Sequence, residues 1–96
     1  MRLTEEERQI IRRVVERFVK NAELYLFGSR ARDETRGGDI DLLVLGDEQV
    51  SMADILRMKI ELKDRLGDQR IDLIYQRKSA LTPFAELARL EGILIS

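Results

Sequence analysis

The stretch GSRARDETRGGDIDLLV, residues 28–44, decides how this chain is organised. It opens with a Gly-Ser pair, passes through a polar segment rich in arginine, and ends in Asp-Ile-Asp followed by apolar residues. The polar composition of residues 29–38 is unsuited to a core element and predicts a loop, with at most one helical turn after Ser29. Polar and apolar residues alternate from Asp39 and then give way to an apolar run. This pattern predicts a strand over 39–45 whose first half reaches an open edge or cleft.

The segments on both sides of this stretch predict a small α/β domain. Thr4 followed by Glu7 has the spacing of a capping box and opens a helix that we expect to run to about Lys20. Ser51 and Asp54 repeat that spacing at the start of a second helix, which ends before a glycine. The remaining patterns predict strands over 23–27 and 70–75, a helix from Thr82-Pro83 to Gly92, and an edge strand in the tail 93–95. The order α-β-β-α-β-α, with a possible terminal strand, belongs to the α/β (α+β) class.

Length and composition exclude many functions. The 96 residues, of which 44% are hydrophobic, fit one small domain (1–96) that buries a modest core and leaves some apolar surface for a partner. The chain has no His and no Cys, which excludes Ser-His-Asp catalysis, thiol nucleophiles and zinc ribbons. A net charge of −1 argues against a broad nucleic-acid surface. The polar N-terminus and short apolar runs lack the features of a signal peptide or a membrane span, so we expect a cytoplasmic protein.

Three aspartates on predicted strands are candidates for a metal site. Asp39 and Asp41 lie two residues apart on a strand, so their carboxylates point to the same face and repel unless a cation lies between them. Oxygen ligands suit Mg²⁺ or Mn²⁺. Asp72 lies between apolar neighbours on another strand, where an ionised carboxylate is costly unless it is paired or bound to a metal. The alternatives are a solvated strand start for the first pair, and an ion pair of Asp72 with Arg70 or Arg77.

The Gly28-Ser29 pair directly after a predicted strand suggests phosphate binding. Glycine lets phosphate oxygens approach the backbone, the serine hydroxyl donates a hydrogen bond, and a helical turn starting there would direct free N–H groups at an anion. An ordinary turn is the alternative for this pair taken alone. Phosphate and metal sites nevertheless belong together, because Mg²⁺ in proteins is often shared with substrate phosphates.

Gly28-Ser29, the polar loop and Asp39-Ile-Asp41 together resemble the signature of the polymerase β-like nucleotidyltransferases. The chain length, the third acidic strand Arg70-Ile-Asp-Leu-Ile-Tyr75 and the trailing Leu-Glu-Gly-Ile-Leu narrow this likeness to the minimal nucleotidyltransferases (MNT). The resemblance extends from about Glu23 to Ile95 and implies a small mixed sheet flanked by helices.

The resemblance also implies roles for individual residues. It assigns catalysis and the binding of two Mg²⁺ ions to Asp39, Asp41 and Asp72, with the last also helping to deprotonate an acceptor hydroxyl. It assigns binding of the triphosphate of ATP to Gly28 and Ser29, with Arg30 and Arg32 as charge partners. Two metal ions that stabilise the entering and leaving oxygens of an in-line displacement need acidic ligands and no covalent nucleophile, which suits a chain without His.

The family precedent implies a protein acceptor. MNT proteins act as antitoxins of helical HEPN toxins, which are RNases. The resemblance implies transfer of AMP from ATP to a hydroxyl, that of a Tyr, on such a toxin. Apolar surface for docking is expected from the tail 93–95 or from an exposed side of the last helix, whose apolar residues are Phe84, Leu87, Ala88 and Leu90.

Two alternative functions remain open at this stage. The family usually has Gly where Asp33 stands and Ser where Gly38 stands, and its loop is commonly about one residue longer. These departures keep open a non-catalytic antitoxin that blocks the toxin by contact. Nucleotidyl transfer to a small molecule is the other alternative, disfavoured because so short a chain has little surface for a second substrate pocket.

Overall fold

The computed structural model describes residues 3–28, 39–67 and 69–95, with Asp39 described by its backbone alone. The order of its elements confirms the predicted one, and the terminal strand is present. The loop expected over 29–38 lies outside the described residues. The helices and strands are α1 (Glu5–Phe18), β1 (Glu23–Phe27), β2 (Asp39–Gly46), α3 (Met52–Leu66), β3 (Arg70–Arg77), α4 (Pro83–Glu91) and β4 (Ile93–Leu94).

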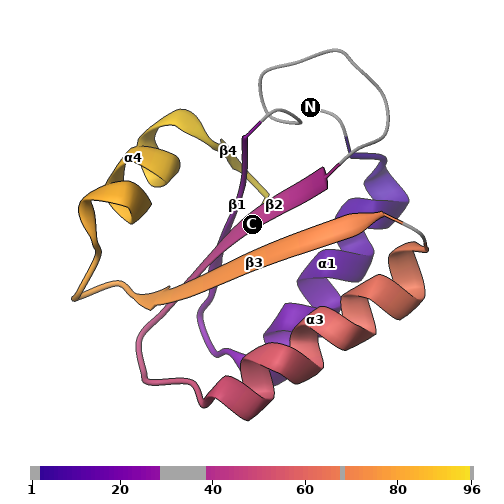
Figure 1. Ribbon diagram of the computed structural model, residues 1–96, viewed down its shortest axis with the longest axis horizontal. Coiled ribbons are helices and arrows are strands. Elements are labelled where there is room, and N and C mark those ends of the chain that lie inside the picture. The colour runs from indigo at the N-terminus through magenta and orange to yellow at the C-terminus, as the bar shows by residue number, and fades with distance from the viewer. Residues whose placement is uncertain (1–2, 29–38, 68, 96) are drawn as a thin grey trace.

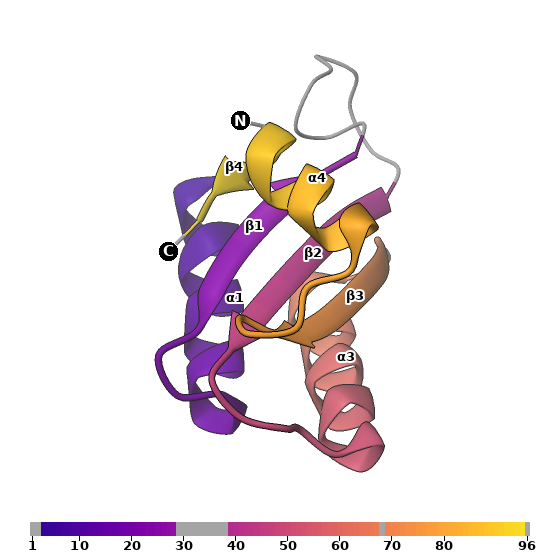
Figure 2. The ribbon, with the colours of Figure 1, turned by 90° about the vertical axis from the view of Figure 1, so that its left-hand side faces the viewer.

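The strands form one mixed sheet in the order β3-β2-β1-β4 (Figure 1). Strand β2 pairs with β1 antiparallel and with β3 parallel, and β4 pairs antiparallel with the other side of β1. Helices α1 and α3 cover one face of the sheet, and the short helix α4 crosses the other face (Figure 2). The parallel pair is possible because α3 carries the chain back along the sheet between β2 and β3.

Side-chain caps define where the helices begin. The backbone N–H of Glu7 donates to Thr4 Oγ1 and the backbone N–H of Thr4 donates to Glu7 Oε1, each at 3.0 Å, which completes the predicted capping box. Ser51 caps α3 and Thr82 caps α4. Helix α1 ends at Phe18, about two residues earlier than predicted, because Val19 already has an extended backbone. Within the described ranges, no helix is long and apolar enough to cross a membrane.

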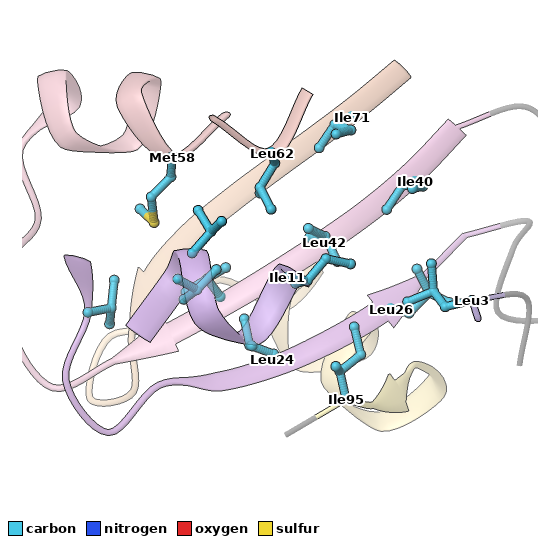
Figure 3. Packing of buried hydrophobic residues seen from close by; sticks show 14 residues of the cluster. Leu3, Ile11, Leu24, Leu26, Ile40, Leu42, Met58, Leu62, Ile71 and Ile95 are labelled. Atoms are coloured by element: carbon cyan, nitrogen blue, oxygen red, sulfur yellow. The ribbon is translucent and has the colours of Figure 1, made fainter. Parts of the chain in front are cut away.

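Most of the core lies between the sheet and the pair α1 and α3 (Figure 3). Strand β2 contributes every second residue to it, and Met58 and Leu62 contribute from α3. Burying one such large aliphatic side chain stabilises the fold by about 1.5–3 kcal/mol, so this layer supplies most of the stability. The largest fully buried members are Ile11, Val14, Val15, Leu24, Leu26, Ile40, Leu42, Met58, Leu62 and Ile95.

The core on the α4 side is smaller and rests on alanines. Leu43 and Leu45 of β2 pack against Ala85 and Ala88 of α4. Of the apolar residues expected on this helix, only Ala88 is buried, whereas the three large ones are exposed. This nine-residue helix contacts the sheet through a single row of side chains, which includes the two alanines. Its larger apolar side chains therefore point away from the sheet. The tail forms the expected edge strand, because β4 pairs with β1 and the N–H of Ile95 donates to Leu24 O at 2.7 Å.

Candidate active site at one end of the sheet

The candidate site residues that the structure describes lie where β1 ends and where β2 and β3 begin. In the register of the sheet, Asp41 lies between Phe27 of β1 and Asp72 of β3. Neighbouring strands are about 4.8 Å apart, so residues that are 31 positions apart in the sequence become direct neighbours. The backbone of Asp39 pairs in the same way with Arg70. This pairing places the three aspartates at one end of the sheet, as the sequence suggested.

Alternation along the strands directs Asp41 and Asp72 toward the α4 side. Their neighbours Ile40 and Ile71 are buried in the core on the opposite face, so the two carboxylates project from the face that α4 covers only in part. Both aspartates are partly buried. Two carboxylates so placed repel each other, and a cation between them would remove that repulsion.

Gly28 provides a close approach to Asp41. Its φ of +76° lies in the left-handed region, where glycine is favoured. A Cβ atom at this position would overlap with Oδ2 of Asp41, so the carboxylate lies directly against the glycine backbone. Because glycine has no side chain, a phosphate near Gly28 could approach a metal held by the carboxylate of Asp41.

Arg70 is a site residue that the sequence indicated only as a partner for Asp72. Its Nε lies 3.6 Å from Asp72 Oδ2, and the side chain is 73% exposed for Arg70 and 40% exposed for Asp72. An exposed ion pair of this kind contributes about 0–1 kcal/mol. The alternative role predicted for Asp72, an ion pair with Arg70, is therefore present, but it is weak enough to leave the carboxylate available to a ligand. The sequence indicated this contact because Arg70 and Asp72 lie two positions apart on one strand and so share a face.

An aromatic pair borders the carboxylates on the α4 side. The rings of Phe27 and Phe84 meet edge to face, with centroids 5.7 Å apart and an interplanar angle of 78°. Phe27 is the register partner of Asp41, so this pair connects α4 to the candidate site. Sequence reasoning placed Phe84 on a helix but had no means of placing it next to the first strand.

Part of the predicted site lies outside the described residues. These predictions concern Ser29, Arg30 and Arg32, together with the departures at Asp33 and Gly38. Among the described residues, no group of three acidic, His or Cys side chains is placed to hold a metal, and the side chain of Asp39 is not among those described. The described donors are the carboxylates of Asp41 and Asp72 near Gly28, and this oxygen-only set fits a hard cation such as Mg²⁺.

A separate hollow lies at the other end of the sheet, away from Asp41 and Asp72. Its volume is about 290 Å³, and its lining includes Asp47, Glu48 and Tyr75. The hydroxyl of Tyr75 donates to the carbonyl oxygen of Glu48. Burial, reinforced by Asp47, raises the pKa of Tyr75, so this phenol stays protonated at neutral pH. Lys78 Nζ donates to Asn21 O at 2.8 Å and joins the adjoining loops.

Comparison with known proteins assigns this arrangement to a family. Residues 7–92 match the nucleotidyltransferase domain family. The chain belongs to this family. Over 76 residues it is 40% identical to the inferred protein adenylyltransferase MJ0435 of Methanocaldococcus jannaschii, and the alignment covers 78% of this chain and 80% of the relative. The resemblance deduced from Gly28-Ser29 and the aspartates is thereby confirmed at the level of the family.

Solved structures of nucleotidyltransferases have the same fold. A structure described as an inferred minimal nucleotidyltransferase is 30% identical, with a TM-score of 0.70 over 92% of this chain and 88% of that one. The MNT antitoxin complex with a tri-AMPylated HEPN toxin of Shewanella oneidensis is 21% identical, with a TM-score of 0.75 over 98% of this chain and 72% of the other. The predicted small mixed sheet of a minimal nucleotidyltransferase is therefore confirmed.

Proposed function

We propose that this nucleotidyltransferase is an antitoxin that transfers AMP from ATP to a hydroxyl, that of a tyrosine, on a HEPN-type toxin and thereby neutralises it. The observation that carries the proposal is the pairing of Asp41 with Asp72 beside Gly28 at one end of the sheet. The 40% identity to an inferred protein adenylyltransferase supports AMP as the transferred group. The fold shared with an antitoxin bound to an AMPylated HEPN toxin supports the class of acceptor.

The proposed transfer is one displacement at the α-phosphorus of ATP. The acceptor oxygen forms a bond to that phosphorus while the bond to the pyrophosphate oxygen breaks, and pyrophosphate leaves. Asp72 accepts the proton of the acceptor hydroxyl and later releases it to water. No covalent intermediate with the protein is required, which agrees with the absence of His and Cys from the sequence.

Asp39, Asp41 and Asp72 would hold Mg²⁺, and we propose two ions. When bound, Mg²⁺ neutralises the charge on the phosphate oxygens and lowers the pKa of the acceptor hydroxyl. Asp41 itself is oriented by its contact with the backbone of Gly28. Gly28 and Ser29 would bind the β- and γ-phosphates, with Arg30 and Arg32 as charge partners, and these assignments follow the family signature.

The acceptor in this proposal is a separate molecule. The described ranges contain one four-stranded sheet and three helices, and the partly covered α4 side is the accessible approach to Asp41 and Asp72. We accordingly propose that residues 1–96 act as one catalytic domain that binds its acceptor in trans.

The experiment that tests the function uses ATP labelled at the α-phosphate. The purified chain is incubated with labelled ATP, Mg²⁺ and lysate of its own host, beside the double variant Asp39→Asn/Asp41→Asn. A labelled protein band that the variant fails to produce, identified by mass spectrometry as a HEPN-type protein modified on tyrosine, is the expected result. Chelation of Mg²⁺ by EDTA should abolish the same band, because the carboxylates then repel one another and the phosphates.

Other outcomes of this experiment, and of expressing the same double variant together with the toxin in cells, would replace the proposal. If the double variant still neutralises the toxin in cells, the chain acts by contact alone. If label appears on a metabolite in the absence of any protein acceptor, the enzyme transfers AMP to a small molecule. A band that persists in the double variant would show that the aspartates are not the catalytic groups.

A further inference from the structure

Helix α4 and the adjoining β4 expose four large apolar side chains, which we call the α4 face. Phe84 is 50% exposed, Leu87 53%, Leu90 83% and Leu94 55%. Leu94 pairs with Tyr25 of β1, so its side chain lies on the same side of the sheet as α4. Large apolar side chains that gather on one side of a sheet mark an interaction site more often than isolated exposed residues do.

The unpaired charges on helix α4 are negative. Glu86 and Glu91 are exposed, and neither has an ion-pair partner among the described residues. The one basic residue of the helix, Arg89, is turned toward the sheet, where its guanidinium lies 2.9 Å from Glu23 and 3.3 Å from the hydroxyl of Tyr25. These contacts raise the pKa of Arg89 and neutralise its charge locally. A partner therefore meets apolar side chains bordered by two uncompensated carboxylates.

The α4 face is continuous with the candidate active site. Phe84 contacts Phe27, and Phe27 is the register partner of Asp41. Leu87 and Leu90 follow Phe84 at about 4.5 and 9 Å along the helix axis, given a rise of about 1.5 Å per residue. Figure 2 shows α4 crossing the face from which the carboxylates project. A macromolecule that packs on these residues has part of its own surface beside Asp41.

A second apolar stripe on α3 differs in position and charge. Met52, Leu56 and Ile60 are exposed there, but the neighbouring side chains include Lys59 and Lys63. Helix α3 lies in the layer on the opposite side of the sheet from the carboxylates (Figure 1). A molecule docked on this stripe would be separated from Asp41 by the sheet, so this stripe is not the place where an acceptor approaches.

We propose that the α4 face is the docking surface for the protein acceptor. Its occupant is an apolar patch of the HEPN-type toxin bordered by lysines and arginines, so this inference rests on the proposed function. An RNase needs a basic surface to bind the phosphates of RNA, and Glu86 and Glu91 complement such a surface. A toxin docked on the α4 face would have its basic surface covered. Its acceptor hydroxyl would also lie near the carboxylates of Asp41 and Asp72, because these project from the same side of the sheet.

The test compares substitutions of two exposed apolar residues on α4 with substitutions of two exposed apolar residues on α3. Leu87→Ser/Leu90→Ser removes apolar side chains from the α4 face, and Leu56→Ser/Ile60→Ser removes them from the α3 stripe. The binding partner is the purified HEPN-type toxin of the same organism. For the α4 variant, both the Kd and the KM for this toxin should rise at least about tenfold. Its KM for ATP and its Tm should stay at the wild-type values. The α3 variant should match the wild type in every quantity.

Charge reversal tests the proposed complementarity separately. Glu86→Lys/Glu91→Lys should slow association with the toxin and reduce its dependence on salt, because long-range attraction is lost. Lys59→Glu/Lys63→Glu on α3 is the matched control and should leave association unchanged. Equal effects of the two reversals would overturn the assignment to α4.

The outcomes separate the docking surface from the proposed function. If the wild-type chain modifies the toxin and Leu87→Ser/Leu90→Ser does so with unchanged KM, the docking surface is wrong and the function stands. If the wild-type chain neither binds nor modifies the toxin, the function itself is wrong. If Leu87→Ser/Leu90→Ser instead converts a dimer of the wild-type chain to a monomer, the α4 face binds a second copy and the proposal is overturned.

Discussion

The two faces of the sheet have different roles, although strand β2 contributes side chains to both. Toward α1 and α3, β2 presents Ile40, Leu42 and Val44, all fully buried among large aliphatic side chains. Toward α4, the same strand presents Asp41 followed by leucines that pack on small alanines. The first face is filled for stability, and the second leaves two carboxylates and an apolar helix surface accessible.

This difference explains how a chain of 96 residues retains both a core and a site. A small domain has little apolar surface to bury, so the core is concentrated on one side of the sheet. The other side needs only enough packing to position α4. We therefore expect substitutions on the α4 side to change activity more than stability, and substitutions on the α1 and α3 side to do the reverse.

The largest effect is expected from Asp41→Asn. Removing a ligand of the proposed metal site should slow AMP transfer about a thousandfold or more, which corresponds to about 4 kcal/mol in the barrier. The free energy of unfolding should change by less than about 1 kcal/mol, because the position is near the surface. Rate measurement and urea denaturation on the same preparation check both parts. Asp64→Asn on the exposed side of α3 is the control, and a matching loss of activity there would contradict the assignment.

A comparable effect on stability is expected one residue further along the strand. Leu42→Ala should reduce the free energy of unfolding by about 3 kcal/mol, because it leaves a cavity in the larger core. Leu87→Ala on the exposed side of α4 should change it by no more than about 0.5 kcal/mol. Chemical denaturation of both variants measures the contrast. Equal losses would show that α4 contributes to the core as much as the opposite layer does.

An intermediate effect is expected for Gly28→Ala. Both Gly28 and Gly67 have a positive φ, but a Cβ atom at Gly67 would meet nothing within 4 Å, whereas one at Gly28 would overlap with the carboxylate of Asp41. Gly28→Ala and the control Gly67→Ala should each cost about 1–2 kcal/mol of stability from backbone strain. Only Gly28→Ala should also slow transfer, because it displaces Asp41. Activity normalised to the folded fraction separates the two, and normal activity of Gly28→Ala would remove the proposed contact from the mechanism.

The smallest effect is expected between α1 and α3, where Glu61 pairs with Arg17. The hydrogen bond from Arg17 lowers the pKa of Glu61 below its usual value of 4.5. A lowered pKa in the folded state means that this pair stabilises the protein above the unfolded pKa and that the contribution is lost as the pH falls. Glu61→Gln should therefore lower the Tm slightly at pH 7, and by progressively less as the pH falls below 4.5. Glu86→Gln on α4 should have no effect at either pH.

The helices and strands were predictable because their signals are local. The capping box of Thr4 and Glu7, the cap at Ser51, and the alternation after Asp39 involve residues within a few positions of one another. The same holds for the candidate chemistry, because two aspartates two residues apart on a strand must share a face. The end of α1 was less predictable, since the apolar pattern continues past Phe18 into Val19, which packs in the core without being helical.

The pairing of distant segments was decided by the tertiary structure. The sequence named Asp41 and Asp72, but only the parallel register of β2 and β3 makes them neighbours. The sequence also predicted that Phe84 lies on a helix. Only the packing of α4 against the sheet through two alanines places that ring against Phe27 and directs the leucines of the helix outward. Sequence patterns report which face a residue takes within its own element, whereas the choice of neighbouring element depends on the packing of the whole chain.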